Sequence, residues 1–135
     1  MSELLYNSTR GGETGCTASQ AVLKGLAKDG GLFMPDRIPA FDFALSALKD
    51  ASYQEVAYRV MRLLLTDYTE EELRACIRGA YDEKFDTPEI APLTYADDAY
   101  YLELFHGKTI AFKDMALSIL PYLMTTAAKK NGVTN

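Results

Sequence analysis

The sequence predicts an α+β fold: a mostly helical N-terminal domain with short strands, followed by the first strands and helix of an α/β domain. Apolar residues recur with helical spacing through much of residues 1–90. The composition then changes at Asp86–Pro92, where two prolines stand in a short connecting stretch. We therefore predict two units, residues 1–90 and residues 91–135, because a chain of 135 residues suits one small domain plus part of another.

The first predicted elements are a strand, a helix and a second strand. The strand at Glu3–Ser8 runs into a polar, glycine-rich stretch. Thr17 is a good helix N-cap, because Gln20 stands three residues later in the arrangement of a capping box. Apolar residues with helical spacing follow, and Asp29–Gly31 is predicted to end this helix. Leu32–Pro35, a short apolar run closed by proline, indicates the second strand.

Helices predominate in the middle of the chain. A short helix is predicted over Phe43–Lys49, and Ser52 is placed to cap the next, whose apolar stripe continues to Leu64. Thr69 and Glu72 form a second capping box. Six apolar residues are predicted to line the buried face that follows: Leu73, Cys76, Ile77, Ala80, Tyr81 and Phe85.

Two strands and a long helix are predicted after the proline-containing stretch. The strands cover Pro92–Tyr95 and Tyr100–Phe105, and the helix covers residues 112–130. Pro121 falls inside that helix, so a kink or a break is expected there. Met115–Met124 is apolar almost all round, so it should be buried in a large core. In so short a chain, an exposed surface of this kind would favour self-association.

Composition and charge exclude several functions. Nineteen acidic residues against fourteen basic ones give a net charge of −5, which argues against nucleic-acid binding. No stretch approaches the length of a membrane span, and the N-terminus lacks the charged and apolar regions of a signal peptide. Cys16 and Cys76 form no CxxC pair, and with one histidine a Cys/His metal site is not expected. We expect two free thiols and a cytoplasmic protein.

Lys113 is the residue that points most strongly to chemistry. It stands at the start of the long apolar helix, where the helix dipole and apolar surroundings both disfavour the ammonium form. A lysine that attacks a carbonyl benefits from this, because the free amine is the nucleophile. Two ordinary alternatives are that Lys113 extends into solvent or pairs with Asp114. His106 taken alone would be structural, and Lys108, in a turn, would be solvated.

The residues around Lys113 resemble those of a known family. Leu104–Leu117 reads LFHGKTIAFKDMAL. This is similar to the block of threonine synthases, fold-type II pyridoxal-phosphate enzymes, in which Phe-His-Gly-Pro-Thr leads into Ala-Phe-Lys-Asp. The N-terminal half agrees, since Leu5–Arg10 (LYNSTR) and Gly31–Pro35 (GLFMP) look like the family's leading domain. The resemblance covers nearly the whole chain.

The resemblance implies roles for five residues of this segment. Lys113 forms the Schiff base with pyridoxal 5'-phosphate, and Phe112 packs either beside the cofactor ring or in the apolar core. His106, Thr109 and Asp114 hold Lys113 or meet the substrate. The second unit then begins the cofactor-binding catalytic domain. The activity implied is a lyase reaction that converts O-phospho-L-homoserine and water to L-threonine and phosphate.

The glycine-rich stretch near the N-terminus is a weaker candidate. Residues 11–15 lack the Gly-Lys-Ser/Thr ending of a P-loop, so we expect a flexible loop over or near the active site. Arg10 is a candidate phosphate contact beside it.

The chain departs from the family pattern in two respects. Lys108 replaces the commoner proline, which leaves the turn freer and adds a positive charge. The family's phosphate cradle and its donor to the pyridine nitrogen follow the part that this chain matches. We therefore expect residues 1–135 to be inactive alone and to lack the cofactor. One alternative is a stand-alone, non-catalytic binding module. The other is a relative of threonine dehydratase, but the blocks Leu5–Arg10 and Gly31–Pro35 argue against it.

Overall fold

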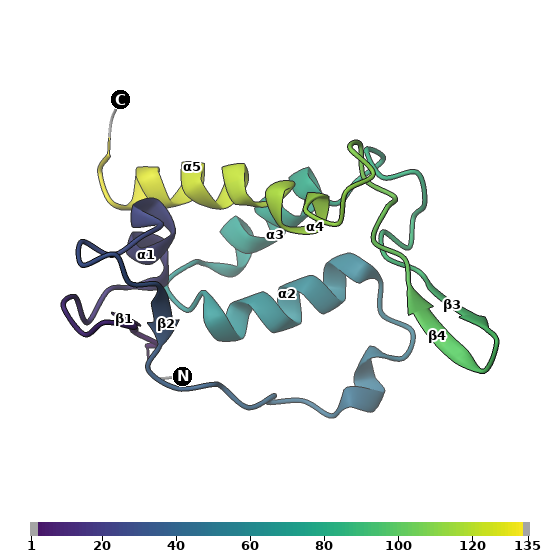
Figure 1. The fold of residues 1–135 in the computed structure, drawn as a ribbon, viewed down its shortest axis with the longest axis horizontal. Coiled ribbons are helices and arrows are strands. Elements are labelled where there is room, and N and C mark those ends of the chain that lie inside the picture. The colour runs from purple at the N-terminus through teal and green to yellow at the C-terminus, as the bar shows by residue number, and fades with distance from the viewer. Residues whose placement is uncertain (1–2, 134–135) are drawn as a thin grey trace.

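The computed structural model describes residues 3–133 and confirms the predicted α+β fold. Short antiparallel strands lie at the two ends of a group of packed helices (Figure 1). In chain order the elements are β1 (Tyr6–Ser8), α1 (Ala18–Lys24), β2 (Phe33–Pro35), the 3-10 helix η1 (Leu45–Leu48), α2 (Tyr53–Leu64), α3 (Glu70–Ala80), β3 (Leu93–Ala96), β4 (Ala99–Leu102), α4 (Asp114–Leu117) and α5 (Leu120–Lys130).

The N-terminal strands and α1 form one end of the molecule. β1 pairs with β2 antiparallel, with Tyr6 opposite Pro35. The predicted capping box is present, since Thr17 accepts from the backbone N–H of Gln20. The predicted stop at Asp29–Gly31 is wrong. Helix α1 already ends at Gly25, whose φ of 68° is a left-handed conformation that glycine adopts without steric cost.

Helices α2 and α3 pack against each other, and α3 supplies much of the core. Ser52 caps α2 and Thr69 caps α3, as predicted. All six residues predicted for the buried face are buried: Leu73, Cys76, Ile77, Ala80, Tyr81 and Phe85. The short helix predicted over Phe43–Lys49 is a single 3-10 turn, Leu45–Leu48.

The single long helix predicted over residues 112–130 is instead two helices. Helix α4 ends at Leu117 and α5 begins at Leu120, so the break precedes Pro121. Proline suits the first turn of a helix, because the N–H that it lacks has no partner within the helix there. The expectation of a fully buried Met115–Met124 segment is wrong for residues 3–133: Ile119 and Leu123 are buried, whereas Leu117, Leu120, Tyr122 and Met124 are exposed.

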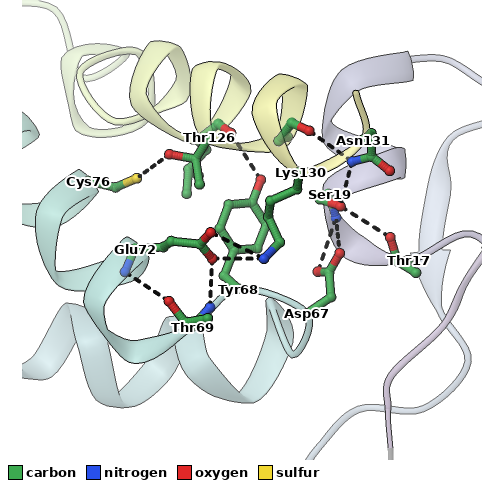
Figure 2. Close-up of polar contacts among 12 residues, drawn as sticks. Thr17, Ser19, Asp67, Tyr68, Thr69, Glu72, Cys76, Thr126, Lys130 and Asn131 are labelled. Carbon is green, nitrogen blue, oxygen red and sulfur yellow. Dashed lines mark hydrogen bonds and ion pairs between the residues drawn. The ribbon is translucent and has the colours of Figure 1, made fainter. Parts of the chain in front are cut away.

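Helix α5 packs against α1 and α3, so the core joins both ends of the chain. Figure 2 shows the polar contacts that accompany this packing. Asn131 donates its side-chain amide to the Ser19 hydroxyl at 2.9 Å, and Lys130 pairs with Glu72 at 2.9 Å. The buried Tyr68 hydroxyl donates to the backbone carbonyl of Leu123 at 3.0 Å. The division near residue 90 stays a prediction, and α5 from beyond it contributes to the core of the first part.

The hairpin β3–β4 projects from the helices at the end opposite β1 and β2 (Figure 1). Asp97 and Asp98 both have positive φ, 49° and 59°, which are the angles of a tight type I′ hairpin turn. Its two strands have largely exposed side chains, many of them apolar: Leu93, Tyr95, Tyr100, Tyr101 and Leu102. Within residues 3–133, no helix has the length and apolar character needed to cross a membrane.

Candidate functional site around Lys113

Lys113 lies at the end of an irregular segment that leaves β4 and enters α4. The segment turns sharply, because the N–H of Ile110 donates to the carbonyl of Gly107 at 3.1 Å. Ile110 has a φ of 66°, which is rare for a β-branched residue. A backbone conformation of this kind costs on the order of 1–3 kcal/mol and persists only where surrounding contacts hold it.

Asp114 has a buried side chain that is fixed by two hydrogen bonds. It is 8% exposed, and its carboxylate accepts two hydrogen bonds from Thr109, from the backbone N–H at 2.8 Å and from the hydroxyl at 2.7 Å. A carboxylate taken out of water needs such partners, because an unpaired buried charge is strongly destabilising. Gly107 lies against it so closely that a Cβ there would come within 2.4 Å of Oδ2. The carboxylate therefore ties the start of α4 to the turn before it.

His106 lies between two carboxylates at the start of the same segment. Its Nδ1 is 2.5 Å from Oδ1 of Asp86, and its Nε2 is 2.7 Å from Oε2 of Glu103. Hydrogen bonds to Glu103 and then to Asp86 raise the pKa of His106 above its usual value. Hydrogen bonds from Thr94 and from His106 lower the pKa of Glu103. The imidazole therefore links the stretch after α3 to the end of β4.

Lys113 itself is the N-cap residue of α4 and is exposed. The expected apolar surroundings are absent among residues 3–133, and the neighbouring Phe112 is 67% exposed. The alternative of an ion pair with Asp114 is also wrong for this part of the chain, because Thr109 occupies that carboxylate. Lys113 extends into solvent here, which was the other alternative. An exposed amine without a carboxylate partner can reach an aldehyde, so this residue fits a covalently bound carbonyl cofactor.

Arg10 belongs to the loop between β1 and α1, and this loop lies at the β1–β2 end of the molecule, away from α4 (Figure 1). Its side chain donates to the backbone carbonyl of Asp29 at 2.9 Å. The same loop is held by the Asp29 carboxylate, which accepts from Ser8 at 2.7 Å and from the N–H of Gly12 at 2.7 Å. The loop therefore does not lie over Lys113, and its contacts are structural.

The structure thus brings most of the predicted site residues together. His106, Thr109, Phe112, Lys113 and Asp114 share one segment, whereas Arg10 is remote from it. The side-chain partners missed from the sequence are Asp86 and Glu103, and the strained backbone at Ile110 was missed as well. Glu103 stands three positions before His106, a spacing that could have suggested a contact. Asp86 is twenty residues away, and the sequence carries no signal of that pairing.

The fold and the site define a small α+β unit that presents an amine at the start of a helix. Comparison with known proteins shows which family this unit belongs to. The family model described as "Threonine synthase N terminus" matches residues 5–81. Threonine synthase from Schizosaccharomyces pombe is 42% identical over 97% of this chain and 26% of its own length. That from Methylobacillus glycogenes is 36% identical over 96% of this chain and 29% of its own length.

Solved structures agree with this assignment. The structure of PLP-bound threonine synthase from Brucella melitensis matches with a TM-score of 0.86 and 35% identity, over 96% of this chain and 28% of that one. Threonine synthase from yeast matches with a TM-score of 0.82 and 33% identity, over 96% of this chain and 27% of that one. The chain belongs to the threonine synthase family and spans 26% to 29% of the length of these relatives.

Proposed function

We propose that Lys113 is the lysine that carries pyridoxal 5'-phosphate in the complete gene product. We further propose that this product converts O-phospho-L-homoserine and water to L-threonine and phosphate. The observation that carries the proposal is the exposed amine of Lys113 within LFHGKTIAFKDMAL, in a chain that belongs to the threonine synthase family. Bound pyridoxal phosphate would supply an electron sink for carbanion charge on the amino-acid substrate.

The residues of this chain would supply attachment and proton transfer. Lys113 would hold the cofactor covalently through its amine. The same amine, when it is not engaged in that attachment, would take up and return protons. Phe112, whose ring is exposed in this chain, would pack beside the cofactor ring. His106, through its contacts with Glu103 and Asp86, would hold the start of the segment.

Residues 1–135 would be inactive by themselves and would not retain the cofactor. An exposed lysine supplies one covalent attachment, and Thr109, the nearest hydroxyl donor in the turn, is already bonded to Asp114. The exposed apolar residues of β3–β4 and α4–α5 support self-association of this chain in isolation. Arg10 is remote from Lys113. It would contact a phosphate group only if residues outside this chain bound that phosphate next to the β1–α1 loop. We also propose a cytoplasmic location, which fits the two free, buried cysteines.

Trapping with borohydride tests the central proposal. The complete gene product is incubated with pyridoxal 5'-phosphate, reduced with borohydride, digested and mapped by mass spectrometry. We expect the phosphopyridoxyl adduct on Lys113 and its loss, with loss of threonine formation, in Lys113→Arg. Lys108→Arg is the matched control, because Lys108 is exposed in the same segment. Label on Lys108 or other surface lysines, and none on Lys113, would contradict the assignment.

A further inference from the structure

The carboxylate of Asp114 closes a loop that ends at Lys113. It reaches back five residues to accept both the N–H and the hydroxyl of Thr109, at 2.8 and 2.7 Å. Two further bonds lie inside the loop. The N–H of Ala111 donates to the Thr109 hydroxyl at 3.4 Å, and the N–H of Asp114 donates to the carbonyl of Ala111 at 3.0 Å. The side chains of Asp114 and Thr109 thus hold the turn before the lysine together with a backbone bond inside it.

The loop holds a conformation that the backbone does not favour alone. Ile110, at its centre, has a φ of 66°, in the left-handed region that β-branched residues avoid. Strain of this kind needs contacts that outweigh it, and the bonds from Thr109 to Asp114 surround the strained residue. Gly107 adds a steric requirement, since a Cβ there would lie 2.4 Å from Oδ2 of Asp114. Without the carboxylate, the turn would lose the two shortest of the hydrogen bonds that hold this shape.

Asp114 also sets the direction of the residue before it. Lys113 already has helical angles, φ −59° and ψ −25°, and consecutive residues in a helical turn point about 100° apart around the axis. Because the Asp114 side chain is buried against the turn, the Lys113 side chain is directed outward. Rotation of Lys113 away from this direction would pull a carboxylate out of its two hydrogen bonds. The direction of the amine therefore depends on the bonds of its neighbour.

We propose that Asp114 is a positioning residue for Lys113: through Thr109 it holds the strained turn at Ile110 and thereby aims the lysine amine at the incoming carbonyl. The inference rests on the proposed function, because it requires Lys113 to be the attacking amine. Both oxygens of Asp114 accept from Thr109 inside the segment, so the role assigned to it is positioning and not proton transfer. A residue that only stabilised the helix would affect unfolding but not the relative reactivity of Lys113.

Two pairs of variants in the complete gene product test this. Asp114→Asn removes one acceptor with little change in shape, and Asp97→Asn makes the same change of charge in the exposed hairpin turn. Thr109→Val removes the hydroxyl, whereas Thr109→Ser keeps both donors. In the cofactor-free protein we expect amide hydrogen exchange at Thr109–Lys113 to be about tenfold faster in Asp114→Asn and Thr109→Val, because charge-assisted bonds are lost. Asp97→Asn and Thr109→Ser should exchange like the wild type.

The second measurement is the rate of borohydride-trapped labelling at Lys113 relative to Lys108 in the same molecule. We expect this ratio to fall about tenfold or more in Asp114→Asn and Thr109→Val, because a small misplacement of a reacting group is costly. Thr109→Ser should restore it. An unchanged ratio in Asp114→Asn, with Lys113 labelled in the wild type, would overturn the positioning role. A wild type that never labels Lys113 would instead refute the proposed function. Equal exchange rates in the wild type and Asp114→Asn would by themselves show that the Asp114 carboxylate does not hold the turn at Thr109–Lys113.

Discussion

At the scale of single residues, hydrogen bonds between side chains set the pKa values of the groups near Lys113. His106 is the clearest case, since it bridges Asp86 and Glu103 and so joins two segments that are distant in sequence. Its raised pKa keeps the imidazole charged to a higher pH than usual, and Glu103 stays charged to a lower pH than usual. The raised pKa of His106 contributes stability that is fully present below about pH 6.5 and is lost as pH rises through the folded pKa. The lowered pKa of Glu103 contributes stability above about pH 4.5 that is lost as pH falls.

This bridge predicts a measurable titration. Because the sequence holds one histidine, its ring protons give an unambiguous NMR signal. We expect the His106 midpoint to lie above 6.5 and to fall towards that value in Asp86→Asn. Asp97→Asn removes the same charge from the hairpin turn and should leave the midpoint unchanged. A midpoint at or below 6.5 in the wild type would show that the bridge is not formed in solution. The pair should stabilise the fold most between about pH 4.5 and 6.5.

At the scale of elements, the ends of the helices are set by local chemistry, and their packing places the site. Thr17 and Thr69 each begin a helix with a complete capping box. Helix α5 is then held on α1 and α3 by apolar packing and by the bonds of Asn131 and Lys130 (Figure 2). Because α4 contacts α5 and directly follows Lys113, this packing fixes the C-terminal side of the lysine segment.

The same substitution at two threonines should have opposite effects. Thr69→Ala removes the side chain that accepts the N–H of Glu72, so the free energy of unfolding should fall by about 1 kcal/mol. Thr125→Ala lies in the interior of α5 on an exposed position, where alanine is the better helix former, so stability should stay equal or rise by roughly 0.5 kcal/mol. Urea denaturation of both variants measures the difference. Equal losses in the two would count against a specific role for the cap.

At the scale of the whole molecule, the core does not follow the order of the chain. Leu123 and Ala127 of α5, with Ile119 just before it, lie in the same apolar cluster as Leu73 and Ile77 of α3. The hairpin β3–β4 stands apart and exposes apolar side chains. An isolated two-stranded hairpin is marginally stable in water, so its order depends on what covers it. The relatives, of which this chain spans 26% to 29%, are long enough to supply such a cover.

Shortening the chain should show which parts form the core. A chain that ends at residue 90 loses Ile119 and Leu123, and each large buried side chain contributes about 1.5–3 kcal/mol. Since domains are stable by about 5–15 kcal/mol in total, we expect residues 1–90 to lose their cooperative thermal transition. The matched control replaces the hairpin, residues 93–102, by a glycine-rich linker and should keep a transition. A cooperative transition in residues 1–90 alone would support the predicted domain division and show that α5 is dispensable.

The sequence by itself determined the starts of α1, α2 and α3 and the hairpin, and it singled out Lys113 as the candidate, because each depends on residues that are close together in the chain. Capping boxes, the Asp97-Asp98 turn and the block around Lys113 are all local patterns. The tertiary structure alone decided the surroundings of that lysine. It showed Lys113 exposed, and Asp114 bonded to Thr109 instead. It also paired His106 with Asp86, because burial and hydrogen bonding depend on contacts that folding brings together.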